Sequence, residues 1–219
     1  MNWNIVKGAC LALLPVAGTL KAQEKPNIVV ILADDLASNE ISCYGGKNLK
    51  TPNIDRIAEE GIRFTNNFAS CAMSVPIRAS LYTGLYPARH GSYQNHKISY
   101  SDIKSVTYYL PQAGYRVGRA GKTHTVPKSV FNFEKVPGFE ENCIAVTADY
   151  TVDGIRDFMR QDSPFCLFVC STLSHAPWTC GNKDEFDADK VILPPNCVDN
   201  KGTRELFRRL LAEIRALDN

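Results

Sequence analysis

The chain of 219 residues has almost no excess charge, since 25 lysines and arginines face 23 aspartates and glutamates and leave a formal net charge of +2. It has no long basic run, which excludes nucleic acid as the main partner because phosphate contacts require clustered Lys and Arg. Its 14 glycines and 12 prolines are spread out and 44 % of its residues are hydrophobic, which excludes a collagen, a coiled coil or a disordered tail. The composition is typical of a globular protein of one or two domains.

The sequence also lacks a hydrophobic run long enough to span a bilayer. The apolar stretch at residues 8–20 follows Lys7 and has the length of a signal-peptide core. We predict a signal peptide over residues 1–22, export to the periplasm or the cell exterior, and no stable membrane insertion. Removal of Lys7 and Lys21 with this segment would leave 23 basic and 23 acidic residues.

The sequence also lacks the cysteine spacing that is typical of zinc sites. None of the eight cysteines belongs to a Cys-x-x-Cys pair or to an ordered Cys/His pattern. Removal of Cys10 with the signal peptide would leave seven, so at least one thiol is expected to be free or paired outside the chain. Cys180 and Cys197 flank a polar loop and form the one predicted disulfide of the exported protein.

Strand-like and helix-like segments alternate along the chain. Strands are predicted at 27–33, 62–68, 115–120 and 165–170, and helices at 51–61, 74–84, 105–113, 147–161 and 203–217. The first and last of these strands are continuous apolar runs, typical of strands buried on both faces of a parallel sheet. The alternation predicts a parallel α/β sheet, in which ligands bind outside the carboxyl ends of the strands.

Two adjacent carboxylates, Asp34 and Asp35, follow the first predicted strand. Such a pair is costly at the end of a buried strand unless a cation neutralises it, and oxygen ligands favour Ca²⁺ or Mg²⁺ over zinc. A turn or a helix N-cap is the alternative interpretation, since Asp-Asp is common there.

Polar residues also gather at the start of the helix predicted over 74–84. Pro76 near the helix start places Ser74 at the N-terminus, where backbone N–H groups and the helix dipole favour an anion. Arg78, one turn later, can reach the same point. The segment therefore predicts a local site for an anionic group.

The pattern Ser74-x-Pro76-x-Arg78, followed by Ala-Ser-Leu-Tyr-Thr-Gly at 79–84, resembles the signature of the sulfatase family, in the version with serine in the first position. Segments 25–35, 121–124 (Gly-Lys-Thr-His) and 174–178 (Ser-His-Ala-Pro-Trp) are similar to further motifs of that family, in the same order. The resemblance implies an alkaline-phosphatase-like α/β fold, with a mostly parallel central sheet and helices on both faces. Within the family the chain is most similar to the heparan N-sulfatase branch, although sulfatases acting on O-sulfated sugars share most of these residues.

The resemblance implies a catalytic group that the chain does not encode directly. A host maturation enzyme would oxidise Ser74 to formylglycine, whose hydrated form attacks the sulfur of a sulfate ester or sulfamate on a sulfated carbohydrate. The cation, Ca²⁺ with Mg²⁺ as the alternative, would be bound by Asp34, Asp35 and residue 74 and would acidify the attacking oxygen.

The remaining catalytic roles are implied in the same way. Arg78 and Lys122 would offset the sulfate charge, His124 would take a proton from the second hydroxyl of the hydrated group, and His175 would bind the sulfate and assist the leaving group. These roles are carried over from the family's motifs and do not follow from spacing alone.

The sequence departs from the family pattern in one respect. The family's second metal pair and a later lysine are not found, and Asp199-Asn200 fits better as the lead-in to the last predicted helix, which has an apolar stripe that missing strands would help to cover. We therefore expect residues 23–219 to be the N-terminal portion of a sulfatase catalytic domain. Two alternatives stay open: a truncated non-catalytic remnant, and a phosphoester or phosphonate hydrolase of the same superfamily.

Overall fold

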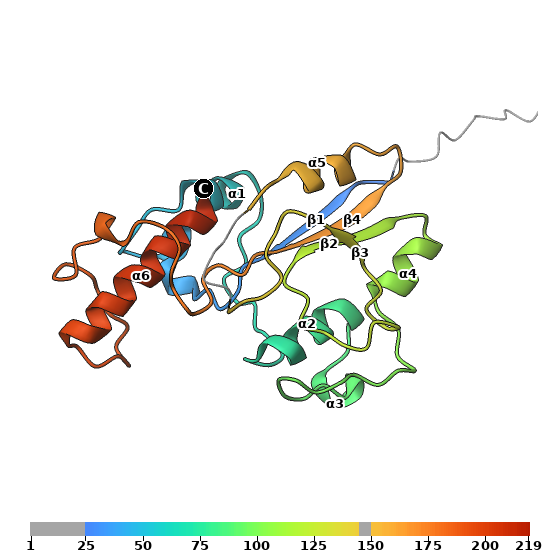
Figure 1. Ribbon diagram of the computed structural model, residues 1–219, viewed down its shortest axis with the longest axis horizontal. Helices are drawn as coiled ribbons and strands as arrows, with labels where there is room; N and C mark the ends of the chain where they lie inside the picture. The colour runs from blue at the N-terminus through green and yellow to red at the C-terminus, as the bar shows by residue number, and fades with distance from the viewer. Residues whose placement is uncertain (1–24, 145–149) are drawn as a thin grey trace, which may run out of the picture.

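A computed structural model describes residues 25–144 and 150–219, so the predicted signal peptide at 1–22 lies outside the described residues. The centre of the described part is a four-stranded sheet with the order β1-β4-β2-β3 (Figure 1). All neighbouring strands are parallel. The strands are β1 (Ile28–Leu32), β2 (Arg116–Gly121), β3 (Glu134–Val136) and β4 (Phe165–Cys170). The parallel α/β prediction is confirmed.

Six α-helices accompany the sheet in the described residues: α1 (Pro52–Glu60), α2 (Ser74–Thr83), α3 (Pro87–His90), α4 (Val106–Gln112), α5 (Asp153–Met159) and α6 (Lys201–Asp218). Single 3₁₀ turns occur at Ser38–Glu40, Ser42–Tyr44 and Lys183–Glu185. The helix predicted over 147–161 is shorter than expected, and residues 147–149 lie outside the described part. None of the described helices has the length and hydrophobicity that a membrane crossing requires.

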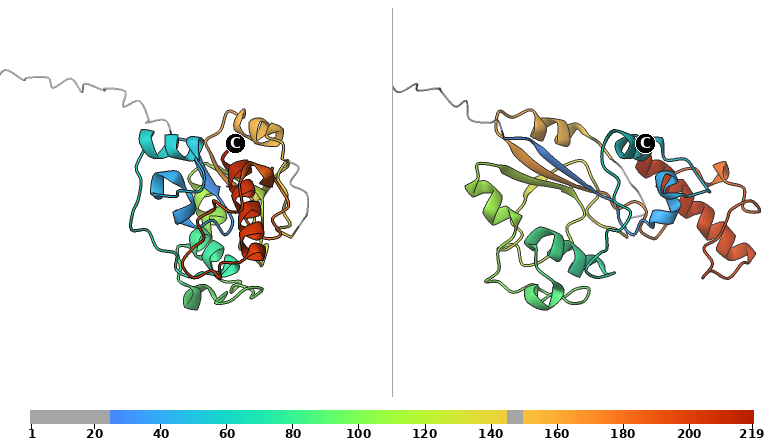
Figure 2. Two further views of the ribbon diagram at one scale, coloured as in Figure 1. Left: turned by 90° about the vertical axis from the view of Figure 1, so that its left-hand side faces the viewer. Right: turned by 180° about the vertical axis from the view of Figure 1, so that it is seen from behind.

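Helices cover both faces of the sheet (Figures 1 and 2). On the face of α2 and α4, the fully buried Tyr82 packs edge-on against Phe133 and Phe168, with ring centroids 4.8 and 5.2 Å apart. On the opposite face, Phe158 of α5 packs against Phe165, 5.8 Å between centroids. Every residue of β4 is buried, because its side chains alternate between these two apolar clusters.

Two predictions about strands are wrong. The strand β1 was expected to be buried on both faces, but Val29 and Ile31 are 46 % and 62 % exposed. The reason is that β1 lies at the edge of the described sheet, and the cluster around α5 includes residues of the other three strands and none of β1. The segment 62–68 forms no strand, and Phe64 and Phe68 are exposed, because no described strand pairs with it.

The last helix packs beside the sheet rather than on it (Figure 2). It begins after Asn200, whose side chain accepts a hydrogen bond from the backbone N–H of Thr203 at 3.0 Å, so the interpretation of Asp199-Asn200 as a helix lead-in is confirmed. Its apolar residues Phe207, Leu211 and Ile214 are buried against Leu49, Phe186 and Val191. The chain itself thus covers the buried part of this stripe, whereas Leu206 is 51 % exposed, and the help of missing strands in covering the stripe stays a prediction.

The carboxylate of Asp218 joins the end of α6 to the start of α1. It accepts hydrogen bonds from the backbone N–H groups of Asn53 and Ile54, at 3.2 and 2.8 Å, and so caps a helix distant in the sequence. In the loop before α6, Cys197 carries a free thiol, so the predicted Cys180–Cys197 disulfide is not formed.

Candidate active site

The predicted site residues meet at the carboxyl ends of the strands, as a parallel sheet requires. The backbone N–H of Asp34, after β1, donates to the carbonyl of Leu173 at 3.1 Å, and the N–H of Lys122, after β2, donates to the carbonyl of Cys170 at 2.9 Å. Gly121 makes this approach possible, because its φ is +81° and a Cβ there would lie 2.1 Å from the Cys170 oxygen. The segments after β1, β2 and β4 are thereby held together.

Asp34 is the buried centre of this region, with 3 % of its surface exposed. Nη2 of Arg78 donates to its Oδ1 at 3.1 Å, and Nζ of Lys122 donates to its Oδ2. The two basic side chains are themselves only 6 % and 1 % exposed. Because the side chain of Asp34 bonds to Arg78 and Lys122, it does not serve as a helix N-cap. One carboxylate facing two cations leaves an excess of positive charge, which favours an anion nearby.

Ser74 is the first residue of α2 and lies at the positive end of the helix dipole. Its Oγ accepts a hydrogen bond from Nε of Arg78 at 3.4 Å and lies 3.1 Å from Nδ1 of His124. The backbone N–H of Val75 donates to Oδ1 of Asn95 at 3.0 Å, which anchors the helix start. Ser74 thus contacts one predicted site residue from its own helix and one from the segment after β2.

A cavity of about 340 Å³ is lined by Asp34, Asp35, Ser74 and Arg78 together with apolar residues such as Leu32 and Met73. Nη1 of Arg78 is buried and has no hydrogen-bond partner among the described residues, so it is available to an anionic oxygen. The carboxylates of Asp34 and Asp35 and the hydroxyl of Ser74 supply oxygen donors to the same cavity. This donor set fits a hard cation such as Ca²⁺ or Mg²⁺.

The two predicted catalytic histidines contact different residues of the site, Ser74 for His124 and Asp35 for His175. Burial, followed by the charge of Lys122, lowers the pKa of His124 from its ordinary value, so its ring stays neutral and can accept a proton. Nε2 of His175 lies 3.6 Å from Oδ2 of Asp35, which is 65 % exposed. Asp35 and His124 both have positive φ values, 55° and 43°, which are uncommon for residues other than glycine and often occur at functional sites.

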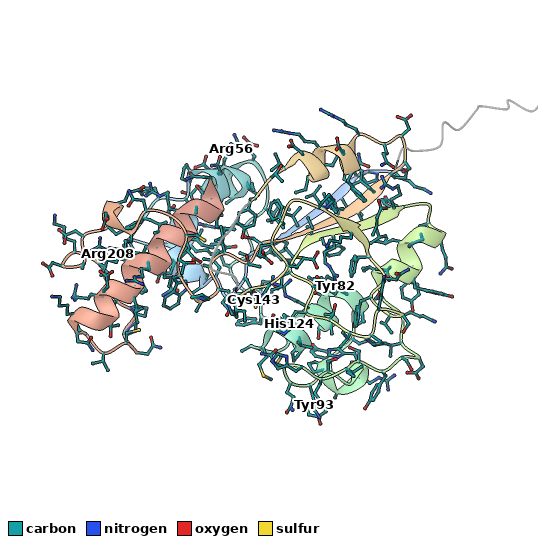
Figure 3. All side chains as sticks on the ribbon, viewed as in Figure 1. Arg56, Tyr82, Tyr93, His124, Cys143 and Arg208 are labelled. Carbon is teal, nitrogen blue, oxygen red and sulfur yellow. The ribbon has the colours of Figure 1, made fainter. Side chains whose placement is uncertain are left out.

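Three residues at this site were not predicted. Asn95 caps α2, and the ring of His96 lies 5.3 Å from that of His124. The polar run at residues 94–96 was an available signal in the sequence. Cys143 offers a sulfur within 4.8 Å of ligand atoms of Asp34 and His175, and no local pattern marked it. Figure 3 labels Cys143 and His124 at the same end of the sheet.

Residues 26–191 match the family model described as Sulfatase. The chain belongs to the sulfatase family. It is 38 % identical over 161 residues to an ulvan-active sulfatase of Formosa agariphila, covering 71 % of this chain and 31 % of the relative. It is 34 % identical over 185 residues to the N-sulphoglucosamine sulphohydrolase of Homo sapiens, covering 80 % and 36 %. The sulfatase chain thus spans about a third of the length of these curated relatives.

A solved structure gives the same fold. Its protein is in complex with its substrate, D-glucosamine-2-N,6-O-disulfate, and superimposes with a TM-score of 0.64 at 27 % identity, covering 79 % of this chain and 40 % of the other. Sulfatases generally use a formylglycine and a divalent cation, which agrees with the serine position and the oxygen-lined cavity described above. The predicted family and its fold are confirmed.

Proposed function

We propose that this chain is part of an exported sulfatase that hydrolyses sulfate esters or sulfamates of sulfated glycans, with a heparan-type N-sulfate as the favoured substrate. The observation that carries the proposal is the contact of Ser74 with Arg78 and His124 beside the buried Asp34–Arg78–Lys122 cluster. This arrangement combines a modifiable hydroxyl, a proton acceptor and an excess of positive charge at one helix N-terminus.

Four side chains of the chain take part directly in the proposed hydrolysis. Nη1 of Arg78, which lacks a partner in the described residues, binds a sulfate oxygen. Lys122, paired with Asp34, adds positive charge behind the sulfate. His124, 3.1 Å from the hydroxyl of residue 74, accepts a proton there, and His175 on the Asp35 side assists departure of the sugar oxygen or nitrogen.

Two groups complete the proposed site. Oxidation of Ser74 by a maturation enzyme of the host removes two hydrogens and gives the formylglycine, which supplies the nucleophilic oxygen when hydrated. A divalent cation, Ca²⁺ or else Mg²⁺, supplies Lewis acidity when bound by Asp34, Asp35 and residue 74. Dialysis against excess chelator should suppress sulfate release, and adding back Ca²⁺ should restore it more fully than Mg²⁺. Full activity in excess chelator would contradict this ligand assignment.

The heparan preference is supported by two relatives. The human relative is named as an N-sulphoglucosamine sulphohydrolase, and the solved structure holds a glucosamine carrying N- and O-sulfate groups. We therefore expect kcat/KM to be higher on N-sulfoglucosamine than on ulvan oligosaccharides or on matched aryl sulfate and aryl phosphonate esters. A higher kcat/KM on the phosphonate ester would favour the phosphonate hydrolase alternative.

The decisive experiment is a mass spectrum of the protein from its native host, together with its sulfate release. A Ser74 peptide lighter by two hydrogens, a mature N-terminus near residue 23 and turnover of a sulfated sugar are expected. Unmodified Ser74 with no turnover would favour the non-catalytic remnant. In assays of sulfate release, Ser80→Ala is the matched control for Ser74→Ala. Ser80 lies on the same helix and contacts His90, so its replacement should leave turnover unchanged.

A further inference from the structure

A sulfur, a ring nitrogen and a carboxylate oxygen converge beside the candidate active site. The ligand atoms of Cys143, His175 and Asp34 all lie within 4.8 Å of one another. Asp34 is buried, and the other two residues are half-buried. The three residues come from different segments: the end of β1, the chain before α5 and the end of β4. A mixed S, N and O donor set is the kind that binds Zn²⁺, whereas Ca²⁺ and Mg²⁺ prefer oxygen alone.

The orientation of His175 fits a metal ligand. Its Nδ1–H donates to the backbone carbonyl of Ala176 at 2.5 Å, which leaves the lone pair of Nε2 free. Metal-bound histidines usually make such a bond with their other ring nitrogen. Nε2 lies 3.6 Å from Oδ2 of Asp35, and two ligands of one tetrahedral zinc are separated by about 3.4 Å. Asp35 nevertheless lies outside the cluster, because its carboxylate is not among the ligand atoms that all lie within 4.8 Å of one another, so water is left to provide a fourth ligand.

We infer that Cys143, His175 and Asp34 form a site for a borderline-soft divalent cation of the Zn²⁺ type. On binding, the thiol of Cys143 releases its proton to solvent and the thiolate coordinates the ion. Asp34 can take part although Arg78 and Lys122 already bind it, because an ionised carboxylate has about four lone-pair sites. The site shares Asp34 with the proposed hard-cation set but adds sulfur and nitrogen ligands.

Occupancy of this site regulates turnover, a consequence that rests on the proposed function. An ion on Nε2 of His175 prevents that nitrogen from assisting the leaving group, and it competes for Asp34. The sulfatase is therefore inhibited by Zn²⁺ through Cys143. Replacing Cys143 relieves the inhibition without changing basal turnover, because the thiol has no part in the proposed reaction.

Cd²⁺ is the direct probe, because a cadmium–thiolate bond gives an ultraviolet charge-transfer band. The full-length reduced protein is titrated with Cd²⁺, and its Zn²⁺ affinity is measured by competition with a chromogenic chelator. Wild type should show the band, Cys143→Ser should lose it, and the Zn²⁺ affinity of that variant should fall by at least about tenfold. Cys197→Ser is the matched control and should behave as wild type, since its thiol lies in the loop before α6.

The variant His175→Ala tests the proposed Zn²⁺ site independently of Cys143. It should weaken Zn²⁺ binding by a similar factor while the Cys143 thiol still reacts with a thiol reagent, so misfolding of one variant does not decide the outcome. All binding measurements are repeated in Ser74→Ala, where they need no turnover, so failure of the proposed function is distinguished from failure of this inference. A band that persists in Cys143→Ser, or Zn²⁺ binding unchanged in His175→Ala, would overturn the inference.

Discussion

Replacing Asp34 with asparagine tests the buried charge cluster directly. The substitution keeps the size of the side chain but removes the charge that Arg78 and Lys122 share, and the asparagine NH₂ would face a cation donor on one side. Breaking a buried ion pair by removing one partner costs about 3–5 kcal/mol, because the remaining charge stays buried without compensation. Since both cations are at least nine-tenths buried, we expect the free energy of unfolding to fall by about 3–5 kcal/mol.

The assay is urea unfolding of the full-length protein in excess chelator, so that metal binding does not contribute to the difference. Asp35→Asn is the matched control, because this neighbouring carboxylate is 65 % exposed and its recorded ion-pair contact is His175 at 3.6 Å. A surface change of this kind alters stability by about 0.5 kcal/mol or less. If Asp34→Asn destabilised the protein no more than Asp35→Asn, the argument that Asp34 holds the two buried cations would be refuted.

Three further changes probe the site and the packing around it. Ser74→Ala should abolish sulfate release while keeping the wild-type unfolding midpoint, because its hydroxyl supplies chemistry rather than packing; wild-type turnover would disprove the assignment. Burial raises the pKa of Glu213 above its ordinary value of 4.5, so its ionisation opposes folding at neutral pH. Glu213→Gln keeps an acceptor for the backbone N–H groups of Thr179 and Cys180, so urea unfolding should show it at least as stable as wild type at pH 7. That advantage should vanish below pH 4.5, where the glutamate is protonated in both states; an advantage that grew in acid would contradict the reasoning. Asp218→Ala should lower stability by about 1–2 kcal/mol through loss of the α1 cap, whereas Asp218→Asn should lose less, because its one amide oxygen can still accept from Ile54 or Asn53; equal losses in the two variants would exclude capping as the cause.

Local patterns predicted those elements whose signals lie within a few residues. The helices predicted over 51–61, 74–84 and 105–113 and the strand predicted over 165–170 are of this kind, and the structure confirms them as α1, α2, α4 and β4. Exposure was less predictable, because it depends on what packs over a segment. The strand β1 is entirely apolar, as β4 is, yet Val29 and Ile31 are exposed because no described helix covers them.

The residues of the candidate site were also predictable from the sequence, whereas their contacts were not. Residue types and order along the chain identified the sulfatase family and proposed Ser74, Arg78, Lys122, His124 and His175 as catalytic candidates, with Asp34 and Asp35 as metal ligands. The partners of each side chain were not accessible from order alone. That Asp34 binds two buried cations, and that Asn95 and His96 support the start of α2 and His124, depends on contacts between distant segments.

The sequence by itself therefore determined the parallel α/β class, the ends of α1, α2 and α4 to within one residue, and the family, because hydrophobic periodicity, caps and motifs are local properties of the chain. Only the tertiary structure decided which strand lies at the edge, which charges are buried together and that Cys143 stands beside His175. These are distances between residues far apart in sequence, and they are set by how the helices pack on the two faces of the sheet.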